Sequence, residues 1–243
     1  MTHELPLSIL ANILGHLDSE DRQRVLNVEH LPVLNVRLRE VAPLWQRCDA
    51  SLLNSRGWVT VDDFMGEERV VAGVQAEIRQ LLAEGRMKLA GLTGGVTDEQ
   101  VRSDHHMWIN DVDVEQQPDV KSGVPPCVLS VLRRLDQMKQ QVDHQFEART
   151  QTQLTMYPGG TRGYVRHLDA SKGKSERTLT FLYYANAGWQ PGDGGELRVY
   201  QAHGQHVDVE PRGDRLLVFQ SRQLDHEVLP PNKDRFAITY WVY

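Results

Sequence analysis

The stretch GYVRHLDASKG, residues 163–173, places a histidine and an aspartate two residues apart in an otherwise apolar, strand-like run. In a β-strand, residues i and i+2 point to the same face with Cα atoms about 6.6 Å apart, so His167 and Asp169 can converge on one point. Two such side chains can share a metal ion. A surface hydrogen bond is the ordinary alternative, so the pair defines a site only if the rest of the chain supplies further ligands.

The chain around this stretch, from about residue 150 to the C-terminus, is a succession of short strands. Turn signals separate them, at Pro158-Gly159-Gly160, Gly192-Asp193-Gly194 and Pro230-Pro231-Asn232. Eight short strands at this spacing predict a sandwich or barrel of the jelly-roll kind. The predicted strands are TQLTMY (152–157), YVRHLD (164–169), RTLTFLYYAN (177–186), GELRVYQ (195–201), HVDVEP (206–211), DRLLVFQ (214–220), HEVLP (226–230) and RFAITYWVY (235–243).

Helical periodicity dominates before residue 150. The segments EERVVAGVQAEIRQLLAEG (67–85) and PCVLSVLRRLDQMKQQVDHQF (126–146) are long amphipathic helices, the first closed by Gly85 and the second opened by Pro126. The fold class is therefore α+β: a double-stranded β-helix, or jelly roll, with its core at about 150–243 and long helices supporting it. We expect residues 1–56 to form a small helical N-terminal segment, with a boundary near Ser55 that separates it from a domain at 57–243.

A third ligand for the pair can come from His226, in RQLDHEVLP (222–230). It lies at the edge of another predicted strand, which a jelly roll can fold back across the intervening hairpins. Two imidazoles and one carboxylate on one face of an octahedron form the arrangement associated with non-haem Fe(II) oxygenases. The main rivals are His105-His106, which point to opposite faces of a strand, and His203 with His206, which flank a glycine in a turn.

Arg235 decides between these interpretations. In RFAITYWVY the period of two puts Arg235, Thr239 and Trp241 on one face. An arginine at the start of a core strand is costly to bury unless a carboxylate meets it. A dicarboxylate whose 2-oxo acid end chelates iron while its far carboxylate meets the fork of Arg235 satisfies this need. An internal salt bridge is the alternative for the arginine alone.

Composition limits the other classes of function. The 243 residues carry a net charge of −6, which gives no basic field for nucleic acid. The two cysteines, Cys48 and Cys127, lack CxxC spacing, which favours a reducing cytosol or nucleus. The start MTHELPLSILANIL has no basic n-region or cleavable site, and no apolar run approaches about 20 residues, so we expect neither secretion nor a membrane span.

At this point the residues resemble a known family. From about Gly57 to Tyr243 the chain is similar to the 2-oxoglutarate and Fe(II)-dependent prolyl 4-hydroxylases, in the cytosolic branch that includes the hypoxia-inducible-factor prolyl hydroxylases. The matching motifs, in family order, are WVTVDDFMG (58–66), VRSDHHMWI (101–109), MYPGGTRGYVRHLD (156–169), FLYYANAGW (181–189), GGELRVY (194–200), VEPRGDRLLVFQS (209–221), HEVLP and RFAITYWVY.

The resemblance implies a set of roles for residues of this chain. It implies Fe(II), 2-oxoglutarate and O2 as cofactor and cosubstrates, ascorbate as reductant, and a proline of a protein as the substrate, with oxygen sensing as an associated role. The implied metal ligands are His167, Asp169 and His226; the implied 2-oxoglutarate pocket consists of Arg235, Tyr184, Tyr157, Thr239 and Leu197; the implied substrate groove includes Arg177, Asp104 and Trp241.

Some positions depart from the animal oxygen sensors and leave the identity of the target open. Ala170 follows the HxD pair where the sensors have asparagine, and Leu224-Asp225 precedes His226 where they have Asn-Pro. None of these positions is an implied ligand.

The first 56 residues carry a second resemblance. LPLSILANILGHLDSED (5–21) and VAPLWQR (41–47) are similar to an F-box, a motif that docks onto the Skp-type adaptor of cullin ubiquitin ligases. An amphipathic helix pair that caps the jelly roll shows the same periodicity. Two other functions therefore stay open: an adaptor whose oxygenase fold is non-catalytic, and an oxygenase that acts on something other than a prolyl residue.

Overall fold

The computed structural model describes residues 50–90, 101–110, 123–142, 150–170, 175–201 and 204–243. The predicted N-terminal helices and the F-box-like motifs lie outside these residues. The boundary near Ser55 stays a prediction.

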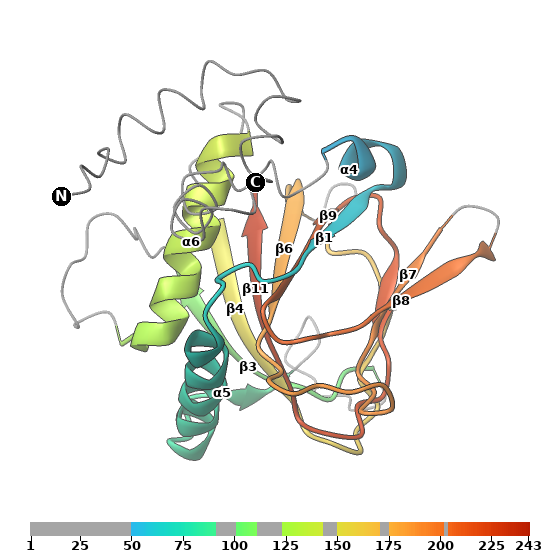
Figure 1. Cartoon of the computed structure of the whole chain (residues 1–243). Helices are drawn as coiled ribbons and strands as arrows, with labels where there is room; N and C mark the ends of the chain where they lie inside the picture. The colour runs from blue at the N-terminus through green and yellow to red at the C-terminus, as the bar shows by residue number, and fades with distance from the viewer. Residues whose placement is uncertain (1–49, 91–100, 111–122, 143–149, 171–174, 202–203) are drawn as a thin grey trace, which may run out of the picture. The chain divides into compact units, whose positions relative to one another are not determined.

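Two antiparallel sheets form the body of the described part of the chain (Figure 1). The larger has seven strands, which in spatial order are β1 (Trp58–Val61), β9 (Arg215–Gln220), β6 (Leu179–Tyr184), β11 (Arg235–Val242), β4 (Thr150–Tyr157), β3 (His105–Asn110) and β2 (Lys88–Leu89). The smaller has four, which are β5 (Tyr164–His167), β10 (His226–Val228), β7 (Leu197–Tyr200) and β8 (His206–Val209). The predicted jelly roll is confirmed, and each of the eight predicted strands is present.

Strand β11 lies at the centre of the larger sheet, and all of its residues are buried. It pairs with β4 on one side and β6 on the other. Alternate side chains therefore meet two different environments. Phe236 packs under Arg79 on the helical side, whereas Arg235, Thr239 and Trp241 face the space between the sheets, as the period of two predicts.

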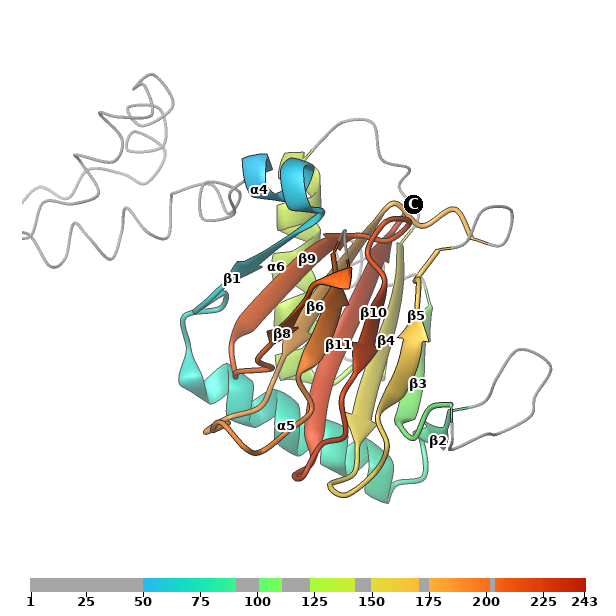
Figure 2. The ribbon, with the colours of Figure 1, turned by 90° about the vertical axis from the view of Figure 1, so that its right-hand side faces the viewer.

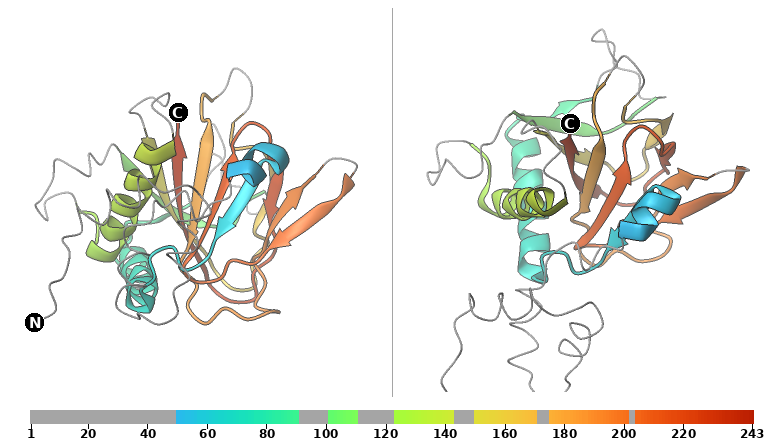
Figure 3. Two further views of the ribbon diagram at one scale, coloured as in Figure 1. Left: turned by 45° about the horizontal axis from the view of Figure 1, so that its top comes forward. Right: turned by 90° about the horizontal axis from the view of Figure 1, so that it is seen from above.

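Two long helices cover the outer face of the larger sheet (Figures 1 and 3). They are α5 (Glu68–Ala83) and α6 (Pro126–Val142), and a short helix, α4 (Ala50–Arg56), packs beside β1. Both long helices bury an apolar stripe, represented by Val74 and Ile78 on α5 and by Val131 and Leu135 on α6. None of the helices in the described residues is long and apolar enough to cross a bilayer.

The apolar interior between the sheets supports the ends of the strands that carry the predicted site. It includes Tyr157, Tyr184 and Leu197, to which the family resemblance assigns one pocket. Figure 2 shows β5 and β10 side by side in front of the larger sheet, so the two histidine-bearing strands face this interior.

Candidate metal centre and cosubstrate pocket

The two predicted histidine ligands lie on neighbouring strands of the smaller sheet. His226 at the start of β10 is the direct register partner of His167 at the end of β5, and their ring centroids are 4.3 Å apart. Each Nδ1 lies against a backbone carbonyl, 2.8 Å from the oxygen of Val165 for His167 and 2.9 Å from that of Leu224 for His226. A carbonyl only accepts, so Nδ1 is the donor in both rings, and Nε2 is the atom left to act as a metal ligand.

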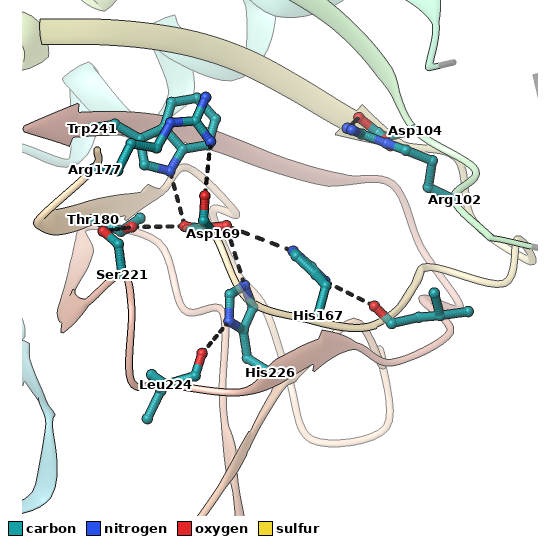
Figure 4. Close-up of polar contacts among 11 residues, drawn as sticks. Arg102, Asp104, His167, Asp169, Arg177, Thr180, Ser221, Leu224, His226 and Trp241 are labelled. Carbon is teal, nitrogen blue, oxygen red and sulfur yellow. Dashed lines mark hydrogen bonds and ion pairs between the residues drawn. The ribbon is translucent and has the colours of Figure 1, made fainter. Parts of the chain in front are cut away.

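Asp169 completes the cluster just beyond the end of β5 (Figure 4). Its Oδ1 lies 3.6 Å from Nε2 of His167 and 3.7 Å from Nε2 of His226. Its Oδ2 accepts hydrogen bonds from the hydroxyl of Thr180 at 2.7 Å and the indole Nε1 of Trp241 at 2.9 Å. One carboxylate oxygen is therefore held by the protein, and the other faces the two imidazoles.

The electrostatics of the cluster favour the charge states that a metal needs. Burial alone would raise the pKa of Asp169, but the imidazoles of His167 and His226 and the hydroxyl of Thr180 outweigh it and hold that pKa below its usual range. Burial lowers the pKa of His226 to about 4, so its imidazole is neutral near pH 7. An ionised carboxylate and a neutral imidazole are the forms that ligate metals.

The donor set fits a ferrous ion. One ligand atom from each of the three side chains lies within 4.8 Å of the other two, and the set of two nitrogens and one oxygen is that of the facial triad. Among the described residues, His105, His106 and His206 join no such group, and His203 lies outside them.

A cavity of about 280 Å³ opens beside the triad. All predicted site residues except Tyr184 and Asp104 line it. The lining members are His167, Asp169, His226, Arg235, Tyr157, Thr239, Leu197, Arg177 and Trp241.

Arg235 carries the second half of the site. It is 3% exposed, and its Nε donates to the carbonyl of Gly195 at 2.7 Å. Its Nη2 is buried with no hydrogen-bond partner among the described residues, and the same holds for the hydroxyl of Tyr184. Burial raises the pKa of Tyr184 to about 12, so this hydroxyl keeps its proton and can donate. An unsatisfied nitrogen of the buried guanidinium and an unsatisfied hydroxyl are together complementary to a ligand carboxylate, such as the far end of 2-oxoglutarate.

The three residues predicted for the substrate groove differ in their surroundings. Trp241 lines the cavity, and its indole also holds Asp169. Arg177 stacks on the Trp241 ring, 3.8 Å from its centroid, and donates to the backbone carbonyl of Asp169 at 3.3 Å. Asp104 is fully buried and is paired through both oxygens with Arg102, which is the member of that pair that lines the cavity.

Several residues of the site were not indicated by any pattern in the sequence. Thr180 supports Asp169, and Ser221 in turn contacts Thr180 at 2.8 Å. Tyr164 stacks on His167 with ring centroids 3.8 Å apart. The alternation of β5 places Tyr164 and His167 on opposite faces, and the shifted register between β5 and β10 brings their rings together. Thr180 and Ser221 are ordinary polar residues in or next to apolar strands, and only the fold brings them to Asp169.

Comparison with known proteins agrees with this geometry. Residues 152–243 match the profile described as the 2OG-Fe(II) oxygenase superfamily. The chain is 34% identical over 201 residues to the protein named prolyl hydroxylase EGLN3 of Homo sapiens, covering 79% of this chain and 80% of that protein. It is 32% identical over 231 residues to the hypoxia-inducible factor prolyl hydroxylase of Caenorhabditis elegans, covering 91% of this chain and 30% of that protein. The chain thus spans less than a third of the nematode relative, and 51% of Egl nine homolog 1 of Mus musculus.

Solved structures show the same fold. A prolyl-4-hydroxylase from Pseudomonas putida is 30% identical with a TM-score of 0.65, covering 82% of this chain and 97% of that one. A prolyl hydroxylase of Trichoplax adhaerens, solved with a peptide fragment of the hypoxia inducible factor oxygen degradation domain, has a TM-score of 0.68 at 23% identity, covering 94% of each chain. The chain belongs to the 2-oxoglutarate and Fe(II)-dependent oxygenase superfamily, in the group of prolyl hydroxylases.

Proposed function

We propose that this chain is a protein prolyl 4-hydroxylase that uses Fe(II), 2-oxoglutarate and O2. The observation that carries the proposal is a single cavity lined both by the triad of His167, Asp169 and His226 and by Arg235, whose Nη2 has no hydrogen-bond partner among the described residues. A purely structural protein has no need of a buried cation without a counter-charge. The names of the relatives support a prolyl residue as the target.

The proposed work of the protein is positioning and exclusion of water. The triad would hold Fe(II) through two Nε2 atoms and Oδ1 of Asp169. Arg235 and Tyr184 would bind the far carboxylate of 2-oxoglutarate, with Tyr157 and Thr239 beside it and Leu197 as the apolar wall. Together the bound iron, 2-oxoglutarate and O2 supply the oxidant that converts a prolyl C–H to C–OH, with release of succinate and CO2. We include ascorbate as the reductant that keeps the iron ferrous.

The substrate would enter where the cavity meets solvent. Trp241, Arg177 and the exposed Trp108 line the cavity, with the two indole rings 5.5 Å apart. An aromatic surface of this kind suits a prolyl ring, which has no side-chain hydrogen-bond donor.

The experiment that tests the function is peptide-dependent turnover followed by mass spectrometry. The purified chain, with Fe(II), 2-oxoglutarate and ascorbate, is incubated with an extract in which the Asp169→Ala variant has replaced the parent protein. We expect succinate release and the addition of one oxygen atom to prolyl residues, and neither with the variant itself. Oxygen added only to other residues would contradict prolyl specificity, and full activity of the variant would contradict the metal assignment.

Two further proposals rest on the sequence alone. Residues 1–56 would bind a Skp-type adaptor as an F-box does, and the protein would work in the cytoplasm or nucleus. The full-length chain should retain a purified adaptor, and replacement of Leu5 and Pro6 by alanine should abolish retention. Equal retention by both would contradict the F-box proposal.

A further inference from the structure

Two hydroxyl groups lie in a row next to Oδ2 of Asp169, the oxygen that faces away from the two imidazoles. Thr180 on β6 and Ser221, the residue after β9, are both fully buried, and their oxygens are 2.8 Å apart. Thr180 is also 2.7 Å from Oδ2 of Asp169. Together with the carboxylate of Asp169, the two hydroxyls form a chain of three polar groups that runs from the protein interior to the ligand triad (Figure 4).

The direction of the hydrogen bonds in this chain follows from counting protons. A carboxylate can only accept, so the one hydroxyl proton of Thr180 is donated to Oδ2 of Asp169. The bond between the two hydroxyls must then run the other way, with Ser221 donating to Thr180. Each donor in the sequence from Ser221 to Thr180 to Asp169 polarises the next, which strengthens the bond at the carboxylate.

The backbone of Ser221 also connects the segments that carry the ligands. Its carbonyl accepts from the N–H of Ala170, the residue after Asp169, at 3.1 Å, and its N–H donates to Thr178 at 3.0 Å. Ser221 lies five residues before His226 in the loop between β9 and β10. The same residue thus joins the Asp169 segment to the loop that leads to His226.

We infer that Thr180 and Ser221 are positioning residues that hold Asp169 as a one-oxygen metal ligand, with Ser221 acting through Thr180. This inference rests on the proposed function, since it requires a metal at the triad. Without the hydroxyl of Thr180, Trp241 is the remaining side-chain donor to Oδ2 among the described residues, and the carboxylate can rotate out of line with the imidazoles.

The test measures the affinity of the folded protein for Mn(II), which is redox-inert. Thr180→Val should weaken Mn(II) binding about tenfold or more, the usual effect of removing an outer partner of a metal ligand. Thr180→Ser keeps the hydroxyl and should bind Mn(II) as the parent does. Ser221→Ala should have a smaller effect than Thr180→Val, and the double variant should bind as Thr180→Val alone, because Ser221 acts only through Thr180.

Thr152→Val is the matched control, since Thr152 is also buried in the larger sheet but does not contact Asp169. A merely structural role would lower the melting temperature of Thr180→Val and leave its Mn(II) affinity equal to that of the control. That result would overturn the inference. If Thr180→Val does not fold, the Mn(II) affinities of Ser221→Ala and Thr180→Ser are compared instead. Equal affinities of these two variants would overturn the inference.

The parent chain and Asp169→Ala separate this inference from the proposed function. No Mn(II) binding by the parent would contradict both. A second result would contradict the positioning inference alone. In that result the parent chain binds Mn(II), Asp169→Ala does not, and Thr180→Val binds it as tightly as the parent.

Discussion

Arg235 is the residue on which the cosubstrate assignment depends. Its guanidinium lies near the rings of Tyr184 and Tyr157, 5.1 and 5.3 Å from their centroids, and its Nη2 has no hydrogen-bond partner in the described part of the chain. Loss of one member of a buried charge pair costs several kcal/mol. Arg235→Gln should therefore raise the KM for 2-oxoglutarate on the order of 100-fold in succinate-release assays, with Mn(II) affinity unchanged.

Arg79→Gln is the control for the Arg235 variant. Arg79 packs against the ring of Phe236 on the other side of the same strand and is about half exposed. We expect its KM for 2-oxoglutarate to equal that of the parent. An equal rise in both variants would indicate damage to β11 rather than loss of a carboxylate partner.

Gly195 gives a second test of the same pocket. A Cβ at this position would lie 2.8 Å from Cδ of Arg235, and the backbone φ is +76°. Gly195→Ala should lower stability by about 1–2 kcal/mol through the left-handed backbone and should also raise the KM for 2-oxoglutarate. Gly188 has φ +68° and open space where a Cβ would be added. Gly188→Ala should therefore lower stability through the backbone but leave the KM for 2-oxoglutarate unchanged. A normal KM for Gly195→Ala would argue against a fixed position of the arginine.

The residue-scale predictions from sequence succeeded where the strand period applies. His167 with Asp169, and Arg235 with Trp241, were assigned to shared faces because residues two apart in a strand point the same way. The sequence could not show that Asp104 is fully buried in a pair with Arg102, or that Trp241 donates to Asp169. The contact of Trp241 with Asp169 depends on which strands become neighbours, and no local pattern encodes this. Arg102 and Asp104 are only two residues apart, so for this pair it is the complete burial of Asp104 that the sequence does not show.

At the scale of elements, the predicted helices and strands were located by their apolar repeats. Two strands had no such repeat: β2, which has only two residues, and β3, whose HHMWIN sequence has adjacent histidines and no alternation. Strand β3 forms because β4 offers a free edge, with which all six residues of β3 pair in register. Tertiary pairing thus overrides a weak local preference.

The contact between the two long helices also has a testable part. Glu77 of α5 accepts the backbone N–H groups of Cys127 and Val128, at 2.8 and 2.9 Å, in the first turn of α6. It acts as an N-cap supplied by another helix. Glu77→Ala should lower the free energy of unfolding by about 1–2 kcal/mol in urea titrations and leave the KM for 2-oxoglutarate unchanged.

Gln80→Ala provides the comparison for this cap. The side chain of Gln80 donates an exposed hydrogen bond to that of Glu84, the residue after α5, and its loss should cost less than about 0.5 kcal/mol. Equal stability of the two variants would show that the cap contributes nothing beyond a surface contact.

At the scale of the whole molecule, the triad of proposed metal ligands joins the two sheets. His167 and His226 belong to the smaller sheet, whereas Asp169 is tied to the larger one through Thr180 on β6 and Trp241 on β11. An ion bound to all three side chains is therefore a cross-link between the sheets. Because an unfolded chain does not hold this geometry, binding should stabilise the folded state.

This cross-link predicts a thermal shift that depends on the triad. Mn(II) alone at about 100 times its dissociation constant should add about 2.7 kcal/mol and raise Tm by about 5–10 °C. Asp169→Ala should remove the shift, since the remaining histidines both lie in the smaller sheet. His206→Ala changes an exposed histidine on β8 and should keep the full shift. A shift that survives in Asp169→Ala would mean that the ion binds elsewhere, and the sheets would then be held together by their apolar interior alone.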